Sequence, residues 1–206
     1  MKVTKMEKPI IIAVCGKSAS GKDTLCTYLI NLFASKHIFA HYIVSDTTRP
    51  QREGEKNKVD YNFLTDFEFY NNIKKQKYLE HTSFNGWHYG TNRDSIVPRS
   101  INVGIFNPDG IKNLIKYQKD FKIVCIYLKC GFLKRLIRSC QREHCFKIEY
   151  LRRAYADHHS FKDINDILCC FPHRFIFNTE RQSLPLIANR VSLWIKMREF
   201  YSYNKS

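Results

Sequence analysis

Long hydrophobic runs are absent from this sequence of 206 residues. No stretch approaches the ~20 consecutive apolar residues that a membrane-spanning helix needs. The apolar run Pro9–Cys15 is too short for a signal-peptide core followed by a cleavage site. We therefore expect a soluble, unsecreted protein with a cytoplasmic location and no membrane partner.

Acidic residues are scarce as well. The chain has 19 Asp and Glu against 34 Lys and Arg, so its formal net charge is +15 at pH 7. Such an excess favours polyanions, namely nucleotides, nucleic acid or anionic lipid, although basic residues also simply solvate a surface. The basic residues form neither a tail nor a block, and we therefore expect no nucleic-acid partner.

Glycine and proline number only 8 and 6, while 44% of the residues are hydrophobic. This composition excludes a collagen-like or disordered chain, and the length fits one domain with small insertions. Cysteine is plentiful, with eight residues. Without a signal peptide we expect reduced thiols. Cys140, His144 and Cys145 could supply zinc ligands, but their spacing does not match paired two-residue gaps, so inert thiols are favoured.

Strand-like and helix-like segments alternate along most of the chain, a pattern that predicts an α/β fold with a parallel sheet flanked by helices. Helices are expected over Asp23–Lys36, after Pro108, twice within residues 132–158, and over Ser183–Phe200. The expected strands are Pro9–Cys15, His41–Val44, Ile101–Asn107, Phe121–Lys129 and Arg174–Asn178. Residues 46–97 break the pattern. We expect them to form an inserted, mostly-β lobe (the inserted lobe) with one helix around Asp66–Lys75.

A glycine-rich motif, GKSASGKDT, lies between the first expected strand and the first expected helix. Its spacing, G-x-x-x-x-G-K, is that of a P-loop, in which backbone N–H groups and a helix N-terminus surround phosphates. Lys22 then places its charge on the β- and γ-phosphates. The sequence therefore predicts a P-loop NTPase-type fold that binds ATP through Gly16, Lys17, Ser18, Ala19, Ser20, Gly21, Lys22, Asp23 and Thr24.

Asp23 departs from the P-loop motif, which has Ser or Thr at this position as a magnesium ligand. A carboxylate near a polyphosphate is repelled unless a cation lies between them, which makes Asp23 a candidate Mg²⁺ contact, direct or through water. The alternative is that Asp23 only occupies the first helical turn, where acidic residues are favourable. The sequence leaves both possibilities open.

Two further motifs resemble the guanylate kinase family. The pattern S-x-T-T-R-x-x-R-x-G-E is followed by D-Y-x-F within residues 45–63, and Glu80 precedes Tyr89-Gly90-Thr91. Together with the P-loop, the resemblance covers residues 10–91 with high specificity and is weaker over 100–206. It implies a nucleoside monophosphate kinase of one domain, with a core of residues 1–45, 98–131 and 160–206. Residues 46–97 would then bind the nucleoside monophosphate, and residues of about 132–159 would form a helical lid.

The resemblance also implies roles for individual residues. The acceptor phosphate would be held by two guanidinium groups and three hydroxyls, which suit a dianion: Ser45, Arg49, Arg52, Tyr61 and Tyr89. Glu80 and Thr91 would bind guanine, because a carboxylate accepts from both the N1–H and the 2-amino group. Arg152 best matches the catalytic lid arginine, and Arg138 is the second candidate. Asn178 matches a position that contacts adenine.

Two carboxylates of the family pattern are missing. Ile105 and Asn107 stand where the family usually has Asp on the third core strand. Asp23 is a candidate substitute for the lost metal-side acid, and Asn107 retains hydrogen-bonding groups for a base. Ribose 1,5-bisphosphate phosphokinases resemble the chain at both departures, but they lack the T-T-R-x-x-R-x-G-E run.

The resemblance implies transfer of the γ-phosphoryl group of ATP, with Mg²⁺, to GMP or dGMP, giving ADP and GDP or dGDP in a monomer or homodimer. The catalytic residues would be Lys22, Arg49, Arg138 and Arg152. No general base is needed, because the acceptor phosphate is itself a nucleophile. The alternatives are a ribose 1,5-bisphosphate phosphokinase-like enzyme and a deoxynucleoside monophosphate kinase of broader range. A non-catalytic binding module is disfavoured by the intact Gly16, Gly21 and Lys22.

Overall fold

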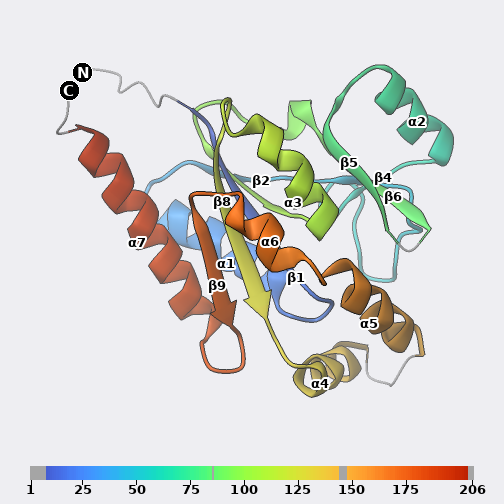
Figure 1. Cartoon of the computed structure of the whole chain (residues 1–206). Helices are drawn as coiled ribbons and strands as arrows, with labels where there is room; N and C mark the ends of the chain where they lie inside the picture. Colours follow the sequence, from blue (N-terminus) through green and yellow to red (C-terminus); the bar gives the residue numbers. More distant parts are fainter. Residues whose placement is uncertain (1–7, 85, 144–147, 204–206) are drawn as a thin grey trace.

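The computed structural model describes residues 8–84, 86–143 and 148–203 (Figure 1). Within these ranges the main sheet has five parallel strands in the order β2-β7-β1-β8-β9. Their bounds are Ala40–Tyr42 (β2), Ile101–Ile105 (β7), Ile10–Gly16 (β1), Lys122–Lys129 (β8) and Arg174–Asn178 (β9). The expected α/β fold with a parallel sheet flanked by helices is confirmed.

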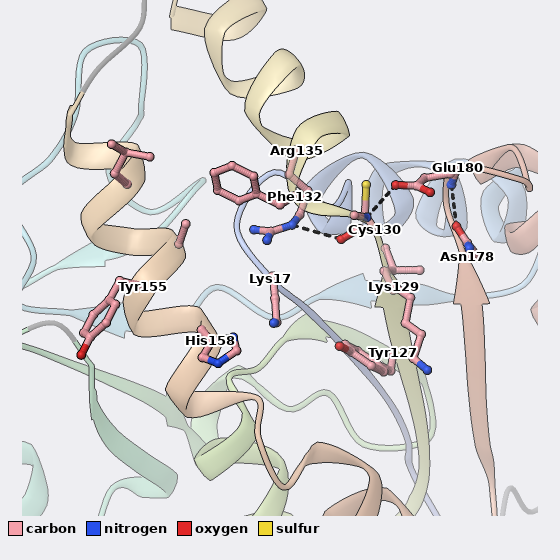
Figure 2. Close-up of a pocket in the computed structure, with 14 residues that line it drawn as sticks. Lys17, Tyr127, Lys129, Cys130, Phe132, Arg135, Tyr155, His158, Asn178 and Glu180 are labelled. Carbon is pink, nitrogen blue, oxygen red and sulfur yellow. Dashed lines mark hydrogen bonds between the residues drawn. The ribbon is translucent and has the colours of Figure 1, made fainter.

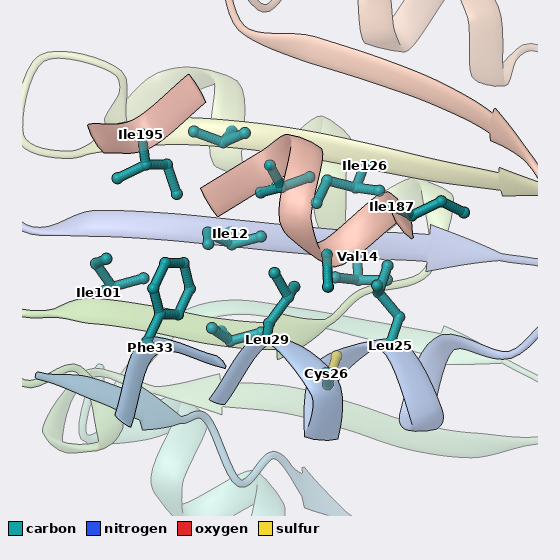
Figure 3. Close-up of a cluster of buried hydrophobic side chains, with 14 of the residues drawn as sticks. Ile12, Val14, Leu25, Cys26, Leu29, Phe33, Ile101, Ile126, Ile187 and Ile195 are labelled. Atoms are coloured by element: carbon teal, nitrogen blue, oxygen red, sulfur yellow. The ribbon is translucent and has the colours of Figure 1, made fainter. Parts of the chain in front are cut away.

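Helices cover both faces of the main sheet. Strand β1 is fully buried, and its alternate side chains enter two separate cores. Ile12 and Val14 pack against helices α1 (Lys22–Ser35) and α7 (Leu184–Tyr203), as Figure 3 shows. Ile11 and Ala13 pack against α3 (Pro108–Leu114) and α6 (Ile164–Cys169) on the opposite face. A continuous apolar strand is the pattern expected when both faces of a parallel sheet are covered.

A second sheet forms within residues 46–92. Its strands lie in the order β4-β3-β6-β5, with bounds Asn62–Phe63 (β4), Asp46–Thr47 (β3), Trp87–Asn92 (β6) and Tyr78–Phe84 (β5). Helix α2 (Asp66–Lys74) begins at a capping box between Thr65 and Glu68. Its buried Phe69 stacks on Tyr78 at a centroid distance of 4.7 Å. This stacking attaches α2 to the second sheet.

Helices α4 (Phe132–Glu143) and α5 (Ile148–Ser160) follow β8, and the short 3₁₀ turns are Arg93–Ser95 and Ile115–Tyr117. The structure differs from the sequence expectations in three details. The second strand ends at Tyr42 rather than Val44, β7 ends at Ile105, and α6 was not expected. Asn107 therefore lies outside the strand and caps α3, accepting a hydrogen bond from Gly110 N–H.

The cysteines that the structure describes are free thiols, and three of them, Cys15, Cys26 and Cys125, are buried. Burial raises the pKa of Cys15 to about 12, which keeps this thiol protonated and inert. His144 and Cys145, two of the three candidate zinc ligands, lie outside the described residues. In the described part of the chain, no helix is both long and apolar enough to cross a membrane.

Candidate active site

The P-loop follows β1 and leads into α1, with a backbone that requires its glycines. A Cβ on Gly16 would lie 2.5 Å from Ser20 Oγ and 2.8 Å from the carbonyl oxygen of Leu128. Gly21, the residue before α1, has φ +99°, a left-handed conformation that disfavours residues with side chains. Ala19 is also left-handed, with φ 60°. The sequence thus produces the sharply bent loop that the motif predicts.

Two side chains of the loop are placed for an anionic ligand. Lys22 Nζ donates to the carbonyl oxygen of Lys17 at 3.3 Å, so its ammonium group stays over the loop. The Ser20 hydroxyl is buried and has no hydrogen-bond partner within the described residues. Buried hydroxyls are nearly always hydrogen-bonded, so an unpartnered one fits a site whose ligand supplies the missing contact.

Helix α5 contacts the P-loop through Asp157. Its Oδ2 accepts a hydrogen bond from Ser18 N–H at 2.6 Å and lies 3.7 Å from Arg135 Nη1. Arg135 also donates to the carbonyl oxygens of Ser18 and Cys130, at 3.3 and 3.1 Å. Both charged side chains are only 5% exposed. No sequence motif pointed to Asp157, although its spacing from two buried residues, seven after Tyr150 and four before Phe161, places it on the buried face of α5.

Arg138 on α4 connects the P-loop to the segment after β9. Its guanidinium group donates to the carbonyl oxygen of Ser20 at 3.3 Å and to the hydroxyl and carbonyl oxygens of Thr179 at 3.2 and 3.0 Å. Asn178 ends β9, and its Oδ1 accepts from Glu180 N–H at 2.9 Å. Arg138, Asn178 and the P-loop are therefore brought to one edge of the main sheet.

A pocket of about 760 Å³ lies beside the loop, at the carboxyl ends of β8 and β9. Figure 2 shows Lys17 between His158 and Tyr155 of α5 on one side and Tyr127 of β8 on the other. Asn178 lines the same pocket. Burial and the Arg135 charge lower the pKa of Lys17, while Asp157 opposes the shift. The pocket lies at the carboxyl ends of parallel strands, which is where ligands bind in open α/β sheets.

A second cluster surrounds Arg49, just after β3. The buried guanidinium group donates to both oxygens of Glu55, at 2.8 and 3.0 Å, and lies over the Tyr61 ring at 5.3 Å. Although burial disfavours its charge, Glu55 raises the pKa of Arg49. The rings of Tyr61 and Tyr89 are 6.1 Å apart. Three of the five residues expected at the acceptor phosphate are thus in contact.

The other two expected residues lie close to this cluster. Arg52 is exposed, and its backbone N–H donates to Glu55 Oε2 at 2.9 Å. Partial desolvation lowers the pKa of Arg52, as do the charges of Arg153 and Arg49. Ser45 directly precedes β3, and its carbonyl oxygen accepts from Asn62 N–H at 2.9 Å.

Glu80, Thr91 and Asn107 form a third group. Thr91 Oγ1 donates to Glu80 Oε1 at 2.6 Å. Burial raises the pKa of Glu80 to about 7, although hydrogen bonds from the side chain and the backbone of Thr91 oppose this shift. A Cβ on Gly110 would lie 3.0 Å from Glu80 Oε2 and 3.1 Å from Asn107 Oδ1, so both oxygens face this glycine. Asn107 Nδ2 donates to Thr82 Oγ1 at 2.7 Å. Two hydrogen bonds within the protein therefore engage its amide.

The two arginines in the middle of α5 share a carboxylate. Arg152 donates to both oxygens of Glu149 at 2.8 Å, and Arg153 Nε donates to Glu149 Oε1 at 3.0 Å. Arg152 also lies over the ring of Trp87 in β6. The two lid arginines expected to be catalytic therefore lie apart: Arg138 contacts the P-loop, and Arg152 contacts the inserted lobe.

Asp23 and Thr24 occupy the first turn of α1, and both are exposed. Burial raises the pKa of Tyr61, and the negative charge of Asp23 adds to the effect. An exposed carboxylate beside a hydroxyl, at the rim of the P-loop, offers oxygen ligands that suit Mg²⁺. Within the described residues there is no group of three or more His, Cys, Asp or Glu that could hold a metal ion.

Comparison with known proteins identifies the same family along most of the chain. The guanylate kinase family model matches residues 6–142. A guanylate kinase of Clostridium perfringens is 38% identical over 95 residues, which are 46% of this chain and 42% of that protein. A guanylate kinase of Chlorobaculum tepidum is 29% identical over 147 residues, 69% of this chain and 72% of that protein. The match to the Clostridium protein thus spans less than half of its length.

The fold has a solved counterpart. The crystal structure of guanylate kinase from Anaplasma phagocytophilum superposes with a TM-score of 0.63 at 18% identity, covering 93% of this chain and 86% of that one. At this identity the likeness concerns the fold alone, whereas the family model matches well over half of the chain's length. This chain belongs to the guanylate kinase family.

Proposed function

We propose that this chain transfers the γ-phosphoryl group of ATP to GMP or dGMP and releases ADP, as a cytoplasmic enzyme acting as a monomer or homodimer. The observation that carries the proposal is the buried Glu80 carboxylate, held by Thr91 Oγ1 at 2.6 Å. An ionised carboxylate in this position accepts from guanine N1–H and the 2-amino group together. Adenine lacks that pair of donors.

The acceptor phosphate binds at the cluster around Arg49. Ser45, Arg49, Arg52, Tyr61 and Tyr89 supply its contacts, and Asn107 supports the guanine end by fixing the start of α3 beside Glu80. Glu55 holds the guanidinium group of Arg49 in one orientation through two hydrogen bonds. A guanidinium group fixed in advance loses little rotamer entropy when it binds a phosphate oxygen.

ATP binds at the P-loop, with its adenine toward Asn178 in the adjacent pocket. Lys22 leaves the carbonyl oxygen of Lys17 to bind the β- and γ-phosphates, and the Ser20 hydroxyl lies within the same loop. Arg138 fixes α4 against the loop and the segment after β9. Phosphoryl transfer needs such positioning together with neutralisation of the charge that develops on the phosphate oxygens.

Mg²⁺ would be held by ATP together with Asp23, directly or through water, beside the Thr24 hydroxyl. When bound, it supplies neutralisation of charge on the polyphosphate. Asp23 also fits this role because it is exposed and lies in the first turn of α1, directly after Lys22.

A coupled assay of ADP release over the common nucleoside monophosphates and ribose 1,5-bisphosphate tests the proposal. We expect GMP and dGMP to have a kcat/KM at least ~10²-fold above those of AMP, CMP and UMP, because unpaired buried groups penalise the wrong base. Preferential turnover of ribose 1,5-bisphosphate, or no ADP release with GMP, would overturn it.

A further inference from the structure

Helix α5 contacts the inserted lobe through an arginine and a tryptophan. The guanidinium carbon of Arg152 lies 5.5 Å from the centroid of the Trp87 ring. Trp87 begins β6 and pairs with Phe84 of β5, directly after the turn at Gly86. Figure 1 shows this hairpin and α5 on the same side of the molecule. The distance is within the ~6 Å at which a cation is attracted to the face of an aromatic ring.

Glu149 and Trp87 use different parts of the same guanidinium group. Glu149 accepts from Nε and Nη2 of Arg152, both at 2.8 Å, which engages one edge of the planar group. Its face stays available for the indole ring. The hydrogen bonds from Arg152 lower the pKa of Glu149 to about 2, so this carboxylate is ionised at neutral pH. A lysine, with a compact ammonium group, cannot make an edge and a face contact together.

The next residue, Arg153, is oriented by the same carboxylate. Its Nε donates to Glu149 Oε1 at 3.0 Å, and its side chain is only 16% exposed. Desolvation lowers the pKa of Arg52, and the charge of Arg153 adds to this effect. Arg49 acts on Arg52 in the same direction.

We propose that Arg152 is a positioning residue that, with Trp87 and Glu149, holds α5 against the inserted lobe in the nucleotide-free protein, together with Arg153, which donates to the same Glu149 carboxylate. The inference rests on the proposed function. It gives Arg152 a different role from the catalytic one that the family resemblance implied.

Fluorescence of Trp87 tests the contact without nucleotide. The chain has two tryptophans, so Trp194→Phe leaves Trp87 as the only source of tryptophan emission under excitation selective for tryptophan. In this background we expect Arg152→Lys and Arg152→Ala to raise the acrylamide quenching constant of Trp87 at least twofold. Arg190→Lys, an exposed position on α7, is the matched control and should change nothing. Equal quenching with and without Arg152 would overturn the proposal.

Kinetics separate positioning from direct catalysis. Trp87→Ala and Arg152→Lys should each lower kcat/KM for GMP about 5- to 10-fold, with the KM for ATP within twofold, and the double variant should lose no more than either single one. Trp87→Phe keeps an aromatic face and should stay within twofold. A kcat loss of ~10²-fold or more in Arg152→Ala alone, without a matching loss in Trp87→Ala, would place Arg152 on the phosphates and overturn the proposal.

Different results would contradict the proposed function and the positioning role of Arg152. An unaltered chain that transfers nothing to GMP contradicts the proposed function, while the quenching measurement still decides whether Arg152 holds α5 through Trp87. Normal transfer to GMP together with unchanged quenching contradicts the positioning role alone.

Discussion

Asp157 and Ser18 connect α5 to the P-loop: the Asp157 carboxylate accepts the Ser18 backbone N–H at 2.6 Å. The same carboxylate lies 3.7 Å from Arg135, whose guanidinium group donates to the carbonyl oxygens of Ser18 and Cys130. The contact ties the first turn of the loop to one end of α5. Through Arg152, the same helix reaches the inserted lobe. One helix thus joins the regions proposed to bind the donor and the acceptor.

Removing the Asp157 carboxylate should destabilise the protein. Asp157→Ala leaves Arg135 buried without its charged partner, and breaking such a pair costs about 3 kcal/mol. Asp157→Asn still accepts from Ser18 N–H, so its loss should be smaller. Urea denaturation measures both free energies of unfolding, with Asp120→Asn at an exposed site as the control. Equal stability of Asp157→Ala and the unchanged chain would show that the buried pair contributes nothing.

Lys22→Ala should lower kcat by at least ~10²-fold, because it removes charge stabilisation worth roughly 3 kcal/mol in the transition state. The fold should survive, since the Lys22 ammonium group has a single hydrogen bond, to its own loop, in the described residues. Single-turnover transfer from ATP measures the effect, with Lys74→Ala on exposed α2 as the control. Near-full turnover in Lys22→Ala would mean that the loop has no catalytic role.

The raised pKa of Glu80 predicts how stability changes with pH. Burial raises this pKa from 4.5 to about 7, so the nucleotide-free folded state binds more protons than the unfolded state between these values. Stability contributed by the neutral carboxyl is therefore lost as the pH rises from 4.5 to 7, by a few kcal/mol at most. Glu80→Gln should remove this loss. At pH 8, Glu80→Gln should have a higher free energy of unfolding than the unchanged chain, and at pH 4.5 the two should be equal. A difference that does not vary with pH would contradict the raised pKa of Glu80.

Substitution of Asp23 distinguishes two roles for this residue, namely support of Mg²⁺ and stabilisation of the first turn of α1. If Asp23 supports Mg²⁺, Asp23→Ser should raise the Mg²⁺ needed for half-maximal rate, because a charge beside a divalent ion is lost. Adding Ile105→Asp at the end of β7 should recover part of that loss. If Asp23 only stabilises the first turn of α1, worth ~0.3–1 kcal/mol, the melting temperature should shift slightly. An unchanged Mg²⁺ curve would then exclude compensation by Asp23.

The sequence predicted the features that local patterns determine. The apolar run Pro9–Cys15 and the P-loop spacing placed the main sheet and its loop. Glu80 and Thr91, both expected to bind guanine, are hydrogen-bonded to each other in the structure. Contacts between distant segments could not be predicted. Asp157 reaches Ser18 across 139 positions, and Arg152 meets Trp87 only because α5 and β6 fold together. Asn107 was placed on a strand because the apolar run continues to Phe106, whereas its side chain favours capping α3.

The central claim is that a buried carboxylate at Glu80 selects guanine. The most direct test measures kcat/KM for GMP and AMP side by side in the unchanged chain and in Glu80→Gln. The account predicts a preference for GMP of at least ~10²-fold in the unchanged chain, since sites that hydrogen-bond a polar edge discriminate by up to ~10⁵-fold. Glu80→Gln should lose most of the GMP activity, because an amide cannot accept from both guanine donors. Phosphorylation of AMP as well as GMP by the unchanged chain would contradict the claim.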